Sequence, residues 1–147
     1  MPNTGVLMDK ISGNNTIARF CDKKSISASG RVSGTAFKLR PRDKGNLSTN
    51  WVEYIESTMH KNALKHLQDF YNKIMTDTSN AKIGYLNVKK TINYVKRESK
   101  DNRKLDIYHN GKLSRSNPSH SIITGTELDE MEIFDLLAET LIATHNF

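Results

Sequence analysis

The stretch LDIYHNG, residues 105–111, is the part of this chain that decides the fold class. Apolar and polar side chains alternate over its first five residues, a pattern typical of a strand with one buried face. Asn110-Gly111 follows at once, and this dipeptide tolerates the positive φ angles of a tight hairpin turn. The stretch therefore predicts an antiparallel hairpin with Leu113 on the return strand.

Other strand signals lie on both sides of this stretch. Period-2 alternation or β-branched residues predict strands over residues 16–20, 25–28, 31–40, 82–88 and 119–124. In the third of these, Thr35, Phe37 and Leu39 share one face, and Pro41 ends the strand because it has no N–H to donate. Gly125 ends the last one. The strand content is therefore high and its connections are short, which favours antiparallel pairing.

Two stretches carry helical periodicity. Apolar residues recur every three or four positions from Trp51 to Ile74, and Asn50 with Glu53 has the spacing of a capping box. A second start at Ser57 favours two helices over one, with the end near Thr76. Residues 126–147 predict a C-terminal amphipathic helix that begins at Thr126 and ends near His145. Residues 89–97 fit a helix or a strand equally well.

These elements predict an α+β fold, mainly an antiparallel sheet with one central amphipathic helix and a C-terminal amphipathic helix. At 147 residues the chain has the length of a single domain, 1–147, with residues 1–10 frayed. Cys21 is the only cysteine, so the fold has no intrachain disulfide, which indicates a reducing, cytoplasmic compartment. No stretch is apolar enough for a membrane span, and the first residues do not form a signal peptide.

Charge is distributed unevenly along the chain. The net charge is +6, but residues 81–115 hold ten Lys and Arg against three Asp and Glu, whereas residues 116–147 hold six acidic residues and no Lys or Arg. This polarity predicts a basic body that contacts a polyanion or an acidic partner. The candidate binding residues are Lys38, Arg40, Arg42, Lys44, Lys89, Lys90, Lys96, Arg97 and Arg115. Tyr85, Tyr94 and Tyr108 are interleaved with them, as stacking contacts to single-stranded nucleic acid require.

His109 and His120 are the candidate catalytic residues. Two imidazoles at one cleft could act as general base and general acid on a phosphodiester without a metal. The remaining histidines and the lone cysteine do not have the spacing of zinc ligands, so no metal site is predicted. Nucleotide-binding glycine loops and nucleophile-elbow motifs are absent from the sequence, and no cofactor is predicted.

Three strings resemble those of small bacterial proteins that have no assigned activity. The strings are RVSGTAF at 31–37, LSTNWVEY at 47–54 and NPSHS at 117–121. The resemblance implies a bacterial or phage origin, and it carries over no functional residue.

The leading hypothesis is a basic, non-enzymatic binding or accessory module that contacts nucleic acid or a larger protein complex, with no membrane partner. The first alternative is a metal-independent phosphodiesterase or RNase that uses His109 and His120. The second is a regulator that docks on its partner through the C-terminal helix. Whether the protein is an enzyme, and its oligomeric state, stay open at the level of sequence.

Overall fold

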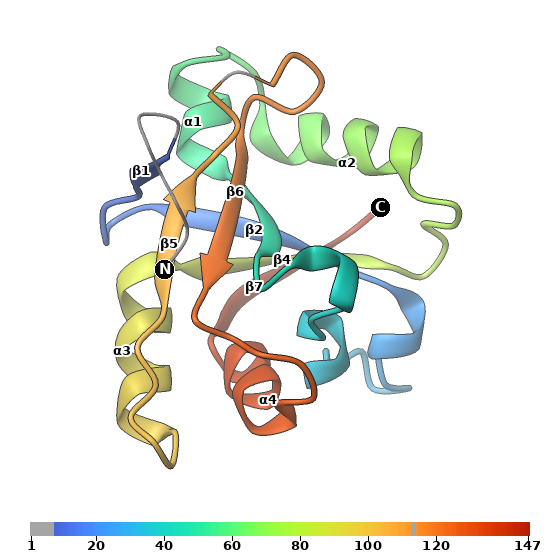
Figure 1. Ribbon diagram of the computed structural model, residues 1–147. Coiled ribbons are helices and arrows are strands. Elements are labelled where there is room, and N and C mark those ends of the chain that lie inside the picture. Colours follow the sequence, from blue (N-terminus) through green and yellow to red (C-terminus); the bar gives the residue numbers. More distant parts are fainter. Residues whose placement is uncertain (1–7, 113) are drawn as a thin grey trace.

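A seven-stranded antiparallel sheet forms the centre of the protein (Figure 1). The computed structural model describes residues 8–112 and 114–147. The strands are β1 (Asp9–Lys10), β2 (Thr16–Cys21), β3 (Leu47–Trp51), β4 (Lys82–Asn87), β5 (Asp106–His109), β6 (His120–Thr124) and β7 (Leu141–Asn146). Their order across the sheet is β1-β5-β6-β3-β2-β4-β7. The α+β fold with a mainly antiparallel sheet, predicted from sequence, is confirmed.

Helices cover both faces of this sheet. The helices are α1 (Val52–Ser57), α2 (Ala63–Ile74), α3 (Val88–Glu98) and α4 (Met131–Glu139), and η1 (Lys23–Ser25), η2 (Gly34–Phe37) and η3 (Pro41–Asp43) are short 3-10 turns. In Figure 1, α1 and α2 lie above the sheet and α3 and α4 lie below it. The upper core contains Ile55, Leu67 and Ile83, and the lower, larger one contains Phe37 and Phe134. Because both faces of the sheet are covered, neighbouring residues of one strand are both buried, as are Ile17 with Ala18 and Ile122 with Ile123.

The first predicted helical stretch is broken, as favoured from its second start signal, but the break lies further along the chain. Asn50 belongs to β3 and Glu53 accepts a hydrogen bond from the Thr16 N–H, so the expected capping box is not formed. The second helix begins at Ala63, because the Asn62 side chain accepts from the Lys65 N–H and caps the first turn. The ambiguous stretch 89–97 is helical in α3, and the Asn87 side chain caps this helix in the same way by accepting from the Lys90 N–H.

The strand predicted over 31–40 is wrong. Residues 34–37 form η2 instead, and Pro41 begins η3 rather than ending a strand. Gly34 packs directly on α4, where a Cβ atom would lie 2.1 Å from the Asp135 Oδ1 atom. Ala36 and Phe37 are both buried although they are neighbours, which a strand with one buried face does not allow. Packing against α4 thus overrides the period-2 pattern.

The C-terminal helix predicted over 126–147 is also partly wrong. Helix α4 ends at Glu139, and residues 141–146 form β7, which pairs with β4 at the edge of the sheet. His145 therefore lies opposite Ile83 in a strand and does not end a helix. Without residues 141–146 the β4 edge would offer unpaired N–H and C=O groups, and pairing with β7 satisfies them.

The strands predicted over 105–109 and 119–124 are present as β5 and β6, but the tight Asn110-Gly111 turn is wrong, because β5 pairs with β6 across a longer connection. A ten-residue connection joins β5 to β6, and Gly111 packs against the Pro118 and Asn117 carbonyls within it. Leu113, expected on the return strand, lies outside the described residues. Residues 25–28 do not form a strand and make only the isolated bridge Ile26–Val32.

The sheet divides between β2 and β3. These strands pair only at Ile17–Trp51 and Ala18–Asn50, whereas β2 pairs with β4 along its whole length. Beyond Ala18 the two strands separate, and η2 lies beside the opening. This fork positions the candidate site described below.

An ion pair fixes the loops on the α4 side of the sheet. Arg103 donates to both carboxylate oxygens of Glu130, at 2.6 and 2.5 Å, and to the Gly125 carbonyl at 2.9 Å. Glu130 is the residue before α4, and it also accepts from the Glu127 N–H. Two parallel hydrogen bonds fix the relative orientation of the two side chains in addition to pairing their charges. The Arg103–Glu130 pair therefore joins the α3–β5 loop to the start of α4. In the part of the chain that the structure describes, no helix has the length and apolarity of a membrane span.

Candidate functional site

A cleft of about 530 Å³ opens where β2 and β3 separate. Its floor is the divided sheet, one wall is the η2–η3 segment, and the other wall is the end of α2. The residues that line it are Arg19, Phe20, Asp22, Thr35, Ala36, Lys38, Arg40, Arg42, Ser48, Asn50, Phe70, Tyr71, Ile74, Met75, Asn117 and His120. We call this the β2–β3 cleft.

One wall of the β2–β3 cleft is basic. Lys38, Arg40 and Arg42 all line it and are exposed, so the structure brings together three of the four binding residues predicted within residues 38–44. Arg40 forms an exposed ion pair with Asp43 at 3.4 Å, a geometry that contributes little and leaves the guanidinium accessible. Asp22 is the one carboxylate in the lining, and it accepts hydrogen bonds from the backbone N–H and hydroxyl of Ser25. The wall therefore carries a large excess of positive charge.

Arg19 adds a fourth cation at the floor of the cleft. Its Nε donates to the Ala36 carbonyl at 2.9 Å and its Nη1 donates to the Ser48 carbonyl at 2.7 Å, so it spans the gap between β2 and β3. Among the ion pairs of residues 8–112 and 114–147, none includes Arg19. Burial lowers the pKa of this guanidinium. A half-buried arginine held only by neutral carbonyls favours an anionic ligand, because the ligand would supply the missing counter-charge.

The opposite wall is apolar and aromatic. Phe70, Ile74 and Met75 come from the end of α2, and Phe20 comes from β2. The Phe20 and Phe70 rings each pack on Tyr71, with ring centroids 5.3 and 5.5 Å apart. Ile74 is 54% exposed, unusually high for a large aliphatic side chain, and it lies at the rim of this wall. The β2–β3 cleft thus presents cations on one side and apolar side chains on the other.

Polar side chains fill the floor between the two walls. The Asn50 Nδ2 donates to the Tyr71 hydroxyl at 3.0 Å, and the Ser119 hydroxyl donates to the Asn50 Oδ1 at 2.9 Å. Burial raises the pKa of Tyr71 to about 12, so its hydroxyl stays protonated at neutral pH. This network fixes β3 against α2 and β6.

His120 lies in the β2–β3 cleft, and both of its ring nitrogens have partners. The Nδ1 atom lies 2.5 Å from the Asn110 Oδ1, and the Nε2 atom lies 3.2 Å from the Ser48 Oγ. Since the Asn110 Oδ1 only accepts, Nδ1 carries the proton and Nε2 is free to accept from the Ser48 hydroxyl in the neutral ring. Burial, and secondly the charge of His109, lower the pKa of His120, which favours this neutral form.

His109 does not share the β2–β3 cleft with His120. It pairs with Ser121 across β5 and β6, so the two imidazoles, one residue out of register, project to opposite faces of the sheet. The His109 ring is buried between Trp51 and Tyr54, and its Nε2 donates to the Pro118 carbonyl at 2.8 Å. The geometry therefore gives no support to these two histidines acting together on one substrate.

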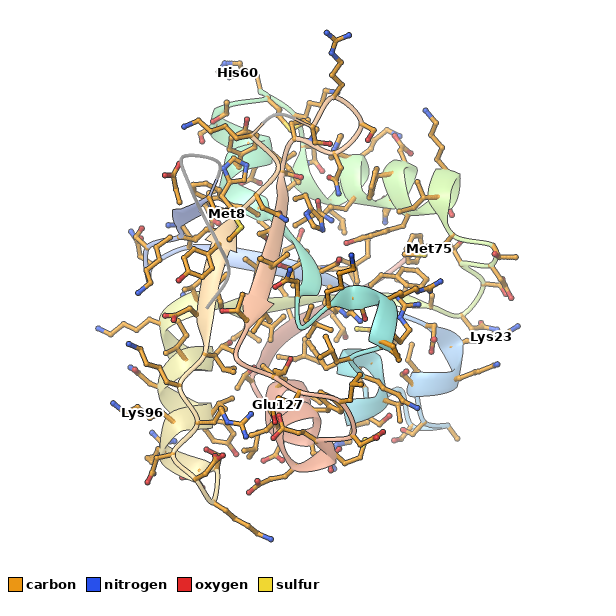
Figure 2. The ribbon with its side chains drawn as sticks, in the orientation of Figure 1. Met8, Lys23, His60, Met75, Lys96 and Glu127 are labelled. Atoms are coloured by element: carbon orange, nitrogen blue, oxygen red, sulfur yellow. The ribbon has the colours of Figure 1, made fainter. Side chains whose placement is uncertain are left out.

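The other predicted binding residues lie elsewhere. Lys89, Lys90, Lys96 and Arg97 are exposed on α3, on the other face of the sheet from α2. Figure 2 shows Lys96 and Met75, which lines the β2–β3 cleft, on opposite sides of the view. Lys44 lines a separate hollow with Lys104, and Arg115 is exposed in the β5–β6 connection. The predicted binding residues thus form at least two surfaces instead of one.

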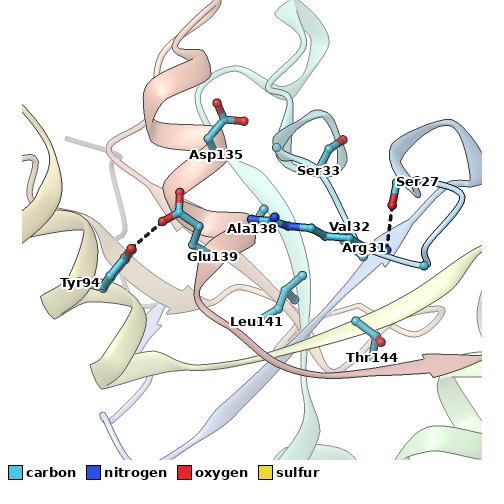
Figure 3. A pocket seen from close by; sticks show the side chains of 12 residues that line it. Ser27, Arg31, Val32, Ser33, Tyr94, Asp135, Ala138, Glu139, Leu141 and Thr144 are labelled. Atoms are coloured by element: carbon cyan, nitrogen blue, oxygen red, sulfur yellow. Dashed lines mark hydrogen bonds between the residues drawn. The ribbon is translucent and has the colours of Figure 1, made fainter.

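A second hollow, of about 860 Å³, lies between α4 and the segment before η2 (Figure 3). Arg31 reaches across it toward Ala138 and Glu139, and the Tyr94 hydroxyl donates to Glu139 at 2.6 Å. Asp135 and Glu139 give this hollow two carboxylates against one cation. The apolar residues Ile133, Phe134 and Leu137 of the same helix are buried in the lower core, so they are not available to a docking partner.

Sequence reasoning missed Arg19, Ser48 and the aromatic wall. A signal for Arg19 did exist, since it is the one charged residue in the strand TIARFC. Ser48 gave no such signal, because only the β3–β6 pairing brings it to His120. Among the described residues, no three His, Cys, Asp or Glu side chains gather as a metal site requires. No protein-family model matches the chain, and neither the curated proteins nor the solved structures include one with significant similarity to it.

Proposed function

We propose that the protein is a nucleic-acid-binding module that holds single-stranded nucleic acid in the β2–β3 cleft. The observation that carries this proposal is the convergence of Arg19, Lys38, Arg40 and Arg42 on one wall and floor, opposite an apolar wall. A nucleotide has the same division, with an anionic phosphate at one end and an aromatic base at the other. Single-strand binding proteins combine these two kinds of contact.

Each wall has a distinct part in this proposal. Arg40 and Arg42 neutralise phosphate charge and release counterions, which makes the affinity dependent on salt. Arg19 provides a fixed donor at the floor because its other N–H groups are held by two carbonyls. Phe70 and Ile74 offer the surface for a base, and base–aromatic stacking contributes about 1–3 kcal/mol per base.

The test is a salt titration with matched charge variants. Fluorescence anisotropy of a labelled oligothymidylate of about 12 nucleotides measures the affinity over a range of salt concentrations. For single strands, the slope of log affinity against log salt changes by about 0.7 for each neutralised phosphate contact. Arg40→Gln with Arg42→Gln is therefore expected to reduce the slope by about 1.4.

Lys96→Gln with Arg97→Gln is the matched control, because it removes the same charge from α3. It is expected to leave the slope close to that of the unchanged protein. Phe70→Leu, which retains apolar burial but removes the ring, is expected to weaken binding without changing the slope. Wild-type binding that is absent or indifferent to salt, or equal losses in both double variants, would refute the proposal.

A further inference from the structure

We propose that Ser48 is a nucleophile activated by His120, with Asn110 as the residue that positions the imidazole, and that this group attacks a phosphodiester held in the β2–β3 cleft. This inference rests on the proposed function, because the cleft must first bind the phosphate. It assigns to the site a chemical step that phosphate binding alone does not require.

The three side chains form a chain of hydrogen bonds in the order that nucleophilic catalysis needs. The Ser48 Oγ lies 3.2 Å from the His120 Nε2, and the His120 Nδ1 lies 2.5 Å from the Asn110 Oδ1. A hydroxyl, a base within hydrogen-bond reach and a third group that orients the base are the general signature of an activated nucleophile. The Asn110 N–H also donates to the His120 carbonyl at 3.1 Å, so two bonds hold Asn110 against the base.

The position of Ser48 distinguishes it from the other hydroxyls of the sheet. Ser48 is exposed at the cleft, whereas Ser119 and Ser121 are buried and bond to Asn50 and Thr49. Within the β2–β3 cleft, the Ser48 hydroxyl is the one that contacts His120. Its location predicts that this serine alone meets a bound ligand.

The charge around Ser48 favours phosphoryl transfer over acyl transfer. Arg19 donates to the carbonyl of Ser48 itself, and the basic wall faces the same cavity. Negative charge develops on the non-bridging oxygens when a nucleophile adds to phosphorus, and fixed guanidinium groups stabilise it. The cations that bind the ground state would thus also stabilise the transition state.

The proposed reaction is a substitution at phosphorus in two steps. The Ser48 oxygen forms a bond to phosphorus while its proton moves to the His120 Nε2, and the bond to one ester oxygen breaks. The leaving alcohol takes the proton from His120, which leaves a serine phosphodiester. Water then attacks phosphorus with His120 as the base, and the Ser48 oxygen leaves with the proton, so the net reaction is hydrolysis of one ester bond.

Two measurements test the assignment in the intact protein. Release of 4-nitrophenolate from bis(4-nitrophenyl) phosphate reports turnover, and mass spectrometry after diisopropyl fluorophosphate treatment reports which serine is phosphorylated with loss of fluoride. We expect turnover by the unchanged protein, label on Ser48, and loss of both in Ser48→Ala. His120→Gln is expected to lower turnover by about 10²–10⁴-fold. Ser116→Ala, at an exposed serine of the β5–β6 connection, is the control that leaves both unchanged.

The pH profile tests the positioning role of Asn110. Turnover requires neutral His120, so it is expected to rise with pH through a midpoint below the ordinary value of 6.5. Asn110→Asp replaces the amide with a carboxylate and is expected to move this midpoint to higher pH, because a negative charge favours the imidazolium. Asn110→Leu removes the acceptor and is expected to lower turnover. An unchanged midpoint in Asn110→Asp, or unchanged turnover in a folded Asn110→Leu, would refute the positioning role.

The two proposals fail in different ways. If the oligonucleotide binds to the unchanged protein and to Ser48→Ala alike, but Ser48 is neither labelled nor required for turnover, the nucleophile is refuted and the binding module stands. If binding itself is absent, the proposed function fails first. Turnover that survives Ser48→Ala also overturns the assignment.

Discussion

Replacing Glu130 with glutamine tests the ion pair that joins the α3–β5 loop to α4. The Arg103 and Glu130 side chains are 19% and 21% exposed, so water screens this pair less than the other ion pairs of the described chain. Hydrogen bonds to charged groups contribute about 1.5–3 kcal/mol, and the amide retains one acceptor oxygen. The expected loss in the free energy of unfolding is therefore about 1–2 kcal/mol at pH 7. This corresponds to about 2–8 °C in Tm for a chain of this length.

The loss of stability in Glu130→Gln is expected to depend on pH, because the ion pair needs an ionised Glu130. The hydrogen bond from Arg103 holds the pKa of Glu130 below its ordinary value of 4.5 in the folded state. The unfolded chain therefore takes up this proton at higher pH than the folded one. The stabilising contribution is complete above pH 4.5 and is lost as pH falls through the lower, folded-state pKa. The difference between the unchanged protein and Glu130→Gln should shrink over that range.

Urea unfolding followed by fluorescence of Trp51, the single tryptophan, measures both effects. Glu127→Gln, an exposed carboxylate in the same loop, is the control and is expected to unfold at the urea concentration of the unchanged protein. Equal midpoints for Glu130→Gln and the unchanged protein at pH 7, or a difference that stays constant in acid, would refute the reasoning.

Two further predictions concern packing. Gly34→Ala places a Cβ atom 2.1 Å from the Asp135 Oδ1 and 2.7 Å from the Asp135 backbone nitrogen, so η2 and α4 must separate. The free energy of unfolding in urea is expected to fall by about 1–3 kcal/mol, whereas Ser33→Ala, the control, is expected to stay close to the unchanged protein. An equally stable Gly34→Ala would contradict this contact. Burial raises the pKa of the Cys21 thiol to about 11, so a disulfide reagent is expected to react with Cys21 only in denaturant. Rapid labelling of the native protein at neutral pH would show that β2 is more accessible than the structure indicates.

Sequence patterns predicted the strands whose apolar residues can be recognised within the strand itself. Strands β2, β4, β5 and β6 were each located to within a residue or two, because each buries side chains that its own sequence reveals. The pattern failed at residues 25–28, which make only the isolated bridge Ile26–Val32, and it did not predict β3 over residues 47–51. It also failed at residues 34–37 and 141–146, where a distant element decides the outcome, namely α4 for η2 and the free edge of β4 for β7.

The candidate site was predicted only in part for the same reason. Lys38, Arg40 and Arg42 are close in sequence, and their shared location followed from it. Arg19 and Ser48 are 29 residues apart and meet through a side chain-to-backbone bond across the fork, which no local pattern encodes. The pairing of His120 with Ser48 likewise depends on a strand register that is set elsewhere in the sheet.

The fork also has a mechanical consequence. The β1-β5-β6-β3 half of the sheet and the β2-β4-β7 half share only two residue pairs, and the Arg19 side chain spans the gap next to them. An anion bound to Arg19 and to groups on β3 would act as a strap between the halves and would resist their separation. By mass action, such a ligand would stabilise the boundary between β2 and β3 increasingly as its occupancy rises, so the connection between the two halves would depend on whether the ligand is bound.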